Sequence, residues 1–308
     1  MQHSYRVIEV TNLANGQPLA LPLHDVQGTT GGPTVGISAA IHGDEGIGVE
    51  VLRRLLEDPA LANLKGRLLL LPLANPLAFQ SYSRNTPIDM LNLNRVFPGD
   101  PNGWLTEQLA QVISDQFLRK IEVHLDLHAG GLFPVVDYVY LLNAPALSRA
   151  FGRPYLYKPA HPSAGTSTEV TLEAGVRTVV VELGGGLVPQ EPYAVQAVAG
   201  LKNVLAELNM LPEHMLVLPK QTLLHRIDIV RPRQGGLFVP VVDQVGVQVH
   251  KGDVLGRVVS PMSLSVLEEM RCPLEQGVMI LTHPTAHRIE PGDYGFMVGD
   301  LQTAEALP

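Results

Sequence analysis

Three histidine and carboxylate positions in the chain could together hold a metal ion. His42 and Glu45 are three residues apart, an offset of about one helical turn that lets an imidazole and a carboxylate reach one ion. They follow the apolar run Thr34–Ile41, and His128 follows a second apolar run, Ile121–Leu127. A catalytic zinc takes three such protein ligands and leaves a fourth position for water. His42, Glu45 and His128 therefore predict one Zn²⁺ per chain and the chemistry of a metallohydrolase.

A further carboxylate, Glu182, ends the apolar run Val176–Val181. A carboxylate buried at such a position needs a partner or a raised pKa, which suits a general base acting on a water molecule. The glycines at residues 184–186 follow it, but no Lys-Ser/Thr pair opens a helix after them. A nucleotide-binding loop is therefore not indicated, and we expect these glycines to let the backbone pass close to a substrate.

The strand expected at residues 121–127, which His128 follows, carries polar side chains on one face. With a period of two, His124, Asp126 and His128 share that face. Asp126 could accept a hydrogen bond from a ligand imidazole and so fix its tautomer. Two other roles stay open for Asp126, namely a cap on the turn at residues 129–131 and direct ligation of the metal. His124 is expected to be structural.

A long polar and proline-rich connection, Asn75–Trp104, holds Arg84, Asn94 and Arg95. Loops of this length inside compact domains usually have a function. A guanidinium can hold a carboxylate through paired hydrogen bonds, and an adjacent amide can share the task. A second, separate arginine could polarise the carbonyl group that is cleaved. The alternative is that these arginines are simply solvated.

The elements that would position these groups alternate between short apolar runs and helical patterns, from about residue 34 to 205. This order is typical of a doubly wound α/β fold, whose ligands bind at the carboxyl ends of parallel strands. Strands are expected at residues 34–41, 67–73, 121–127 and 176–181, and helices at residues 46–56, 105–118 and 195–208. His42, His128 and Glu182 would then meet at one edge of the sheet.

The last third of the chain has a different composition, with closely spaced glycines and valines. Short strands separated by Gly-Asp turns predict a small all-β module at residues 216–308, after a catalytic domain at residues 1–215. The stretch Val249–Gly256 resembles the biotinyl/lipoyl hammerhead domains. Those domains carry a modifiable lysine at a hairpin tip, which is missing from the corresponding Ser260–Ser263. We therefore expect a scaffold rather than a group carrier.

Composition limits the partners of the chain. Of its 308 residues 17% are charged, and the formal net charge is −8, so no broad cationic surface is available for nucleic acid or anionic lipid. The single cysteine, Cys272, excludes an internal disulfide and a thiolate-rich metal site. The N-terminus lacks a basic region followed by an apolar core, and no apolar run approaches the ~20 residues that cross a bilayer. These features predict a cytoplasmic protein that acts on a small molecule, with no membrane partner and with homo-oligomerisation left open.

The order and spacing of four motifs resemble those of the succinylglutamate desuccinylase/aspartoacylase family. The motifs are His42-Gly43-Asp44-Glu45, Asn94-Arg95 followed by Phe97-Pro98-Gly99, Asp126-Leu127-His128, and Glu182. The resemblance spans most of residues 30–200, and a glycine-rich C-terminal β module is also seen in that family. It implies a zinc carboxypeptidase-like α/β fold with a doubly wound, mixed and mainly parallel sheet.

The resemblance also implies an activity, that of a zinc-dependent deacylase cleaving the linear amide bond of an N-acyl amino acid or a related small molecule. His42, Glu45 and His128 would bind the zinc ion, and Glu182 would be the general base. Two other functions stay open, a metallocarboxypeptidase for short peptides and a catalytically silent zinc-binding or ligand-binding protein. Retention of the base speaks against the silent protein.

The long loop would supply the substrate contacts. By resemblance, Arg84 would stabilise the carbonyl oxygen, while Asn94 and Arg95 would hold a substrate carboxylate. One position departs from the family, because relatives commonly carry an aspartate directly before Leu-Asn-Arg and this chain carries Asn92. The support of the loop is therefore expected to differ here.

Overall fold

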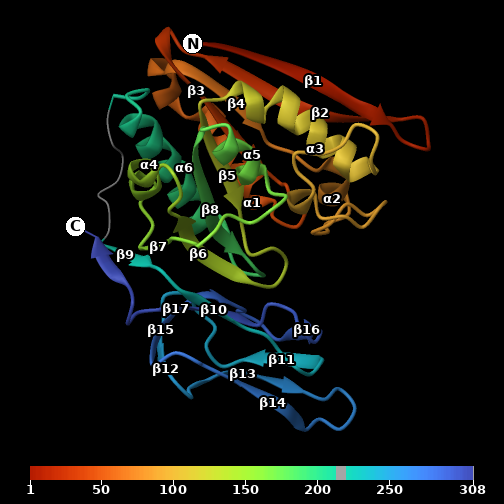
Figure 1. Ribbon diagram of the computed structural model, residues 1–308, viewed down its shortest axis with the longest axis vertical. Helices are drawn as coiled ribbons and strands as arrows, with labels where there is room; N and C mark the ends of the chain where they lie inside the picture. The colour runs from red at the N-terminus through yellow and green to blue at the C-terminus, as the bar shows by residue number, and fades with distance from the viewer. Residues whose placement is uncertain (213–219, 308) are drawn as a thin grey trace.

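The computed structural model describes residues 1–212 and 220–307. Its main feature is a mixed sheet of 14 strands that extends through most of the molecule (Figure 1). The centre of this sheet consists of parallel strands in the spatial order β4-β3-β5-β8. They are β3 (Thr30–Ala39), β4 (Lys65–Leu71), β5 (Val123–His128) and β8 (Arg177–Gly185). These are the strands that the apolar runs predicted.

Antiparallel and short strands flank the parallel centre on both sides. β2 (Pro18–Gln27) pairs with β4, and β1 (Gln2–Asn12) pairs with β2 to form the hairpin at the top of Figure 1. On the other side follow β6 (Val135–Tyr140), β7 (Tyr155–Tyr157), β9 (Gln221–Leu224) and β18 (Glu305–Leu307). The sequence pattern does not reveal these strands, because they are partly exposed, mixed in polarity or only a few residues long.

Helices cover both faces of the parallel centre, as a doubly wound fold requires. α1 (Ile47–Glu57), α4 (Pro145–Ala150) and α6 (Glu191–Glu207) share one buried core with β3 and β5. α3 (Leu105–Gln116) and α5 (Ser167–Glu173) contribute to a second core. Neighbouring residues of β4 alternate between the two, since Leu70 lies in the first core and Leu69 in the second. Burial of each leucine side chain contributes about 1.5–3 kcal/mol to the free energy of folding, so the two cores hold the sheet rigid beneath the site.

Two boundaries differ from the sequence prediction in a way that matters for the site. β5 includes His128, and β8 continues through Glu182 to Gly185, so Glu182 lies inside the strand rather than at its end. The glycines extend β8 because Gly184 and Gly185 pair with β6. The remaining short elements are α2 (Pro76–Gln80) and the 3-10 turns η1 (Pro59–Asn63), η2 (Leu93–Arg95) and η3 (Leu118–Lys120).

The C-terminal part is an all-β module, as predicted. Its strands are β10 (Ile227–Val230), β11 (Gly236–Pro240), β12 (Gln248–His250), β13 (Val254–Val259), β14 (Val266–Arg271), β15 (Gln276–Thr282), β16 (His287–Ile289) and β17 (Phe296–Asp300). Four of them form a second sheet in the order β14-β13-β11-β16. The others join the large sheet, because β15 pairs with β6 through Leu281 and Val136. The predicted domain boundary at residue 215 lies outside the described residues.

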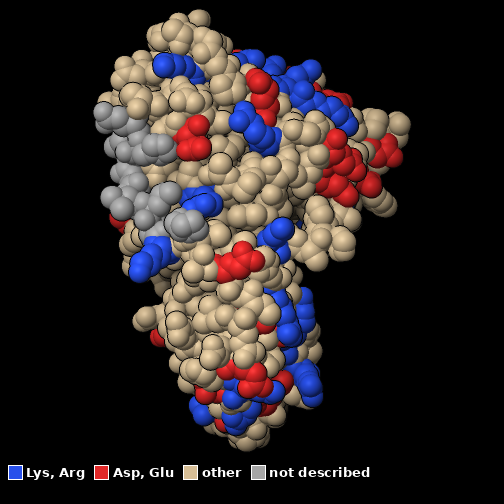
Figure 2. All heavy atoms as spheres, turned by 60° about the vertical axis from the view of Figure 1, so that its left-hand side comes forward, with Lys and Arg blue, Asp and Glu red and all other residues tan. Residues whose placement is uncertain are grey.

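Charged side chains of both signs are interspersed on the face shown in Figure 2, and large parts of that face carry neither sign. The module encloses the single cysteine, Cys272, which is buried as a free thiol. None of the described helices is long and apolar enough to cross a membrane.

Candidate active site

A tight turn between β3 and α1 positions the first two predicted ligands, His42 and Glu45. The turn is held by α2, because the backbone of Gly43 lies so close to Ala78 that a Cβ at this glycine would stand 1.9 Å from the Ala78 carbonyl carbon. Gly43 also donates its backbone N–H to the carbonyl oxygen of Ser83. Both functional residues precede α1, which begins at Ile47. The offset of one helical turn that the spacing of His42 and Glu45 suggested is therefore wrong, and a loop geometry specified by glycine replaces it.

The Glu45 carboxylate bridges two imidazole rings. Its Oε1 lies 2.7 Å from Nδ1 of His42, and its Oε2 lies 2.9 Å from Nδ1 of His128. One ligand atom from each of the three residues falls within 4.8 Å of the others, and all three side chains are buried. The backbone N–H of Ala129 also donates to Glu45 Oε2 at 3.1 Å. The predicted ligands thus form one cluster with the donor types that zinc prefers.

The electrostatics of this cluster favour a positive charge. Burial opposes ionisation of Glu45, yet the neighbouring His42 and His128 hold its pKa well below the usual range. Burial likewise disfavours charge on His128, but Asp126 and Glu45 raise the pKa of this imidazole well above its usual value. The pKa of His42 is lowered, mainly by burial. Two buried carboxylates therefore demand a cation between them, either a proton on His128 or a metal ion, so the residues fit a divalent metal.

Asp126 lies behind His128 and orients its ring. Asp126 Oδ2 is 3.2 Å from His128 Nε2, and the Asp126 carboxylate accepts hydrogen bonds of 2.6 Å from the hydroxyls of Ser38 and Ser167. Although burial opposes it, this environment lowers the pKa of Asp126, with His128 as its main cause. The second predicted polar residue, His124, is fully buried with Nε2 2.8 Å from Ser38 Oγ. Of the three roles left open for Asp126, the geometry matches the orienting one.

His42 faces a different outer partner, the amide of Asn92. Asn92 Oδ1 lies 3.2 Å from His42 Nε2 and also accepts the backbone N–H of Asn94 at 2.9 Å. The Asn94 side chain is fixed in turn, because its Oδ1 accepts the backbone N–H of Ser167 at 2.9 Å. Hydrogen bonds thus connect both imidazoles, through Asn92, Asn94 and Ser167, to the loop that was expected to hold the substrate.

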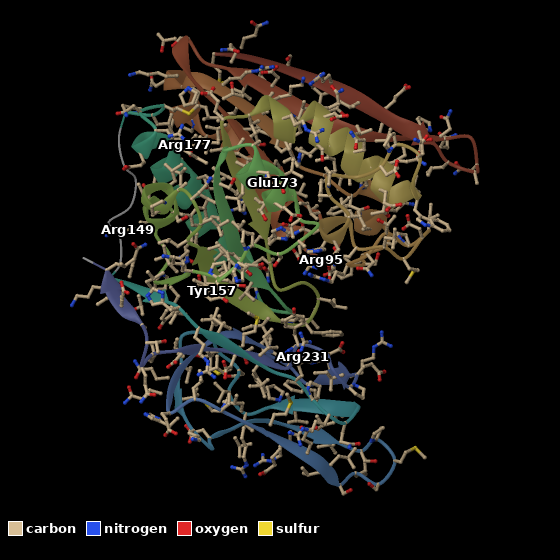
Figure 3. All side chains as sticks on the ribbon, viewed as in Figure 1. Arg95, Arg149, Tyr157, Glu173, Arg177 and Arg231 are labelled. Atoms are coloured by element: carbon tan, nitrogen blue, oxygen red, sulfur yellow. The ribbon has the colours of Figure 1, made fainter. Side chains whose placement is uncertain are left out.

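A cavity of about 110 Å³ opens beside the cluster and collects the other predicted residues. Glu182 lines it, and burial raises the pKa of this carboxyl group to about 8 although the nearby His128 opposes the shift. Arg84 lines it from the long loop and donates to Glu45 Oε1 at 3.0 Å. Asn94 and Arg95 complete this side of the cavity. Figure 3 shows Arg95 at the edge of the α/β part that faces the module carrying Arg231.

Comparison with known proteins identifies the family. Residues 31–208 match the model of the succinylglutamate desuccinylase/aspartoacylase catalytic domain, and this span is more than half of the chain. The chain belongs to this family. The matched span contains all of the predicted ligands, the predicted base and the loop.

Relatives in the family resemble the chain over most of its length. The N-alpha-acetyl-L-2,4-diaminobutyric acid deacetylase of Halomonas elongata is 30% identical over 244 residues, which cover 74% of this chain and 70% of the relative. The product-bound structure of the ectoine utilization protein EutE (DoeB) from Ruegeria pomeroyi is 30% identical, with a TM-score of 0.84 over 97% of this chain and 94% of that one. A succinylglutamate desuccinylase from Silicibacter sp. TM1040 is 28% identical, with a TM-score of 0.82 over 97% and 94% of the two chains.

Several residues in and around the cavity of this chain were not among the residues predicted from the sequence. Ser167 belongs to the hydrogen-bond connection described above, and no motif marks it. The other wall of the cavity comes from β6, from the loop after β7 and from the start of α5, and includes Tyr140, Leu142, Pro159, His161, Thr166 and Thr168. The only signal in the sequence is the pair of prolines around His161, which indicates a loop but not its position.

Proposed function

We propose that this chain is a zinc-dependent deacylase that hydrolyses the linear amide bond of an N-acyl amino acid with a small acyl group. The observation that carries the proposal is the convergence of three groups on one cavity, namely the His42–Glu45–His128 cluster, the carboxyl group of Glu182 and the guanidinium of Arg95. The name of the Halomonas relative supports acetyl as the acyl group. The products are a carboxylate and a free amine, formed by addition of one water molecule.

His42, Glu45 and His128 would hold the zinc ion, which when bound lowers the pKa of a coordinated water to about 7 and polarises a carbonyl group. Glu182 acts as the general base, accepting a proton from the attacking water on its carboxylate and delivering it to the leaving amine. Its burial suits this role, because a raised pKa makes a carboxylate a better proton acceptor at neutral pH.

Arginines on the long loop supply the positive charge toward the substrate. Arg84 contacts Glu45 with one nitrogen, and its remaining donors can stabilise the developing oxyanion. Arg95 donates to the carbonyl oxygen of Asn94 and has further donors for a carboxylate. Among the described residues that line the cavity, these are the only two arginines, and lysine is absent from that wall. If one guanidinium stabilises the oxyanion, one guanidinium is left to bind a substrate carboxylate. This favours a substrate with a single carboxylate.

The deciding experiment compares substrate classes with the zinc-loaded protein. N-alpha-acetyl-L-2,4-diaminobutyrate and other N-acetyl amino acids should be hydrolysed with higher kcat/KM than N-succinyl dicarboxylic amino acids or short unblocked peptides. Preference for peptides would identify a metallocarboxypeptidase instead. Stoichiometric zinc binding without turnover on the whole panel would indicate a silent binding protein.

A further inference from the structure

The two imidazoles of the cluster have unlike outer partners. His128 Nε2 faces the Asp126 carboxylate, whereas His42 Nε2 faces the amide oxygen of Asn92, each at 3.2 Å. Both contacts lie on the side of the ring opposite the Nδ1 atom that meets Glu45. An outer carboxylate makes an imidazole a stronger donor to a metal, while an outer amide orients the ring without that gain.

The Asn92 amide oxygen makes two contacts that fix its orientation. Its Oδ1 accepts the backbone N–H of Asn94 at 2.9 Å, which fixes the start of the turn η2, and the same oxygen faces His42. Because an amide oxygen has two acceptor sites, it can accept from Asn94 and also from His42 Nε2, which carries the ring proton when Nδ1 binds a metal. An aspartate could make the same contacts, so geometry alone does not require asparagine here. The difference between the two residues is one negative charge next to the ring.

Charge around the cluster makes that difference consequential. The Glu45 and Asp126 carboxylates lie against the imidazoles and together match the charge of one divalent cation, and the Arg84 guanidinium lies against Glu45. An aspartate in place of Asn92 would add a third negative charge in contact with a ligand, in a buried region where charges interact strongly.

We propose that Asn92 is a positioning residue that holds the His42 imidazole as a neutral, weaker donor to the metal. With asparagine at this position, the centre binds its ion less tightly than it would with a carboxylate there. The bound ion is then a stronger Lewis acid. The inference rests on the proposed metal site.

The test measures zinc affinity of the full chain without substrate, by competition with a chromogenic chelator. Asn92→Asp should tighten zinc binding about 10-fold, and Asn92→Ala should weaken it about 10-fold because the ring loses its anchor. Asn102→Asp adds the same charge to an exposed position of the same loop and should leave the affinity unchanged. Circular dichroism of each metal-free variant checks that it folds.

A pH profile gives a second readout that a purely structural role would not move. Asn92→Asp should shift the acidic limb of kcat/KM to higher pH, since a less electrophilic ion activates water less well. Zinc affinity of Asn92→Asp equal to or weaker than that of the folded wild-type chain would overturn the inference. A wild-type chain that binds no zinc would instead defeat the proposed function, so the two failures are distinguishable.

Discussion

His128 and Glu182 are register partners on the neighbouring parallel strands β5 and β8. Partners in a parallel ladder point to the same face of the sheet, and both side chains line the same cavity. The backbone ladder therefore sets the separation of the proposed base from a proposed ligand. Replacement of one side chain should leave the other in place, so that binding and chemistry can be measured separately.

Replacement of Glu182 by glutamine tests the chemistry. The variant keeps the size of the side chain but cannot accept a proton, so turnover should fall at least ~100-fold. Its zinc content, measured by atomic absorption, should stay at the wild-type level. Loss of zinc from this variant would mean that Glu182 is a ligand rather than the base.

Replacement of His128 by alanine tests the metal site. Removal of one of three ligands should sharply reduce the zinc that remains bound after gel filtration. His161→Ala is the matched control, because this histidine also lines the cavity but is exposed and belongs to no cluster that could hold a metal among the described residues. Unchanged zinc stoichiometry in His128→Ala would remove His128 from the site.

Arg95 tests the recognition of a carboxylate. Arg95→Ala should lower kcat/KM strongly for an N-acetyl amino acid and much less for the matching amide, since loss of a desolvated charged partner costs ~2–5 kcal/mol. Arg95→Lys should recover only part of the loss, because an ammonium group cannot reproduce the planar fork. Equal losses on acid and amide would instead assign Arg95 to support of the loop or to the transition state.

The module should make the metal-free protein sensitive to acid through His283. This side chain is 2% exposed, its Nε2–H donates to the Tyr294 carbonyl oxygen, and burial, with His287 beside it, lowers its pKa from 6.5 to about 4. Between these pH values the unfolded chain binds a proton that the folded chain excludes. The free energy of unfolding should therefore decrease as pH falls from about 6.5 to about 4.

The size of this effect can be measured against a variant. Urea unfolding is measured in EDTA at pH 7.5 and at pH 4.5. Between these pH values the free energy of unfolding of His283→Asn, which keeps a donor, should fall by roughly 2–3 kcal/mol less than that of the wild-type chain. A decline of equal size in both proteins would assign the acid sensitivity to other groups.

The sequence predicted the central strands because burial on both faces of the sheet leaves apolar runs, and the order of strands and helices then brought His42, His128 and Glu182 together. The contact of Asn92 with His42 could not be predicted, since the path of a long loop leaves no periodic signal. The place of Tyr140 in the cavity depends on the antiparallel pairing of β6, which no local pattern encodes. The spacing of His42 and Glu45 placed their side chains together, although a loop rather than a helical turn carries both residues.

The ladder between β6 and β15 has a consequence for synthesis on the ribosome. Val135 and Val136 pair with Thr282 and Leu281, which are made roughly 7 to 30 s later at ~5–20 residues per second. During that interval this part of β6, next to the strand of Glu182, is an open sheet edge, the kind of edge that pairs readily with other chains. The nascent chain should therefore depend on chaperones until the module has been completed, and a chain truncated after α6 should aggregate rather than accumulate as a smaller enzyme.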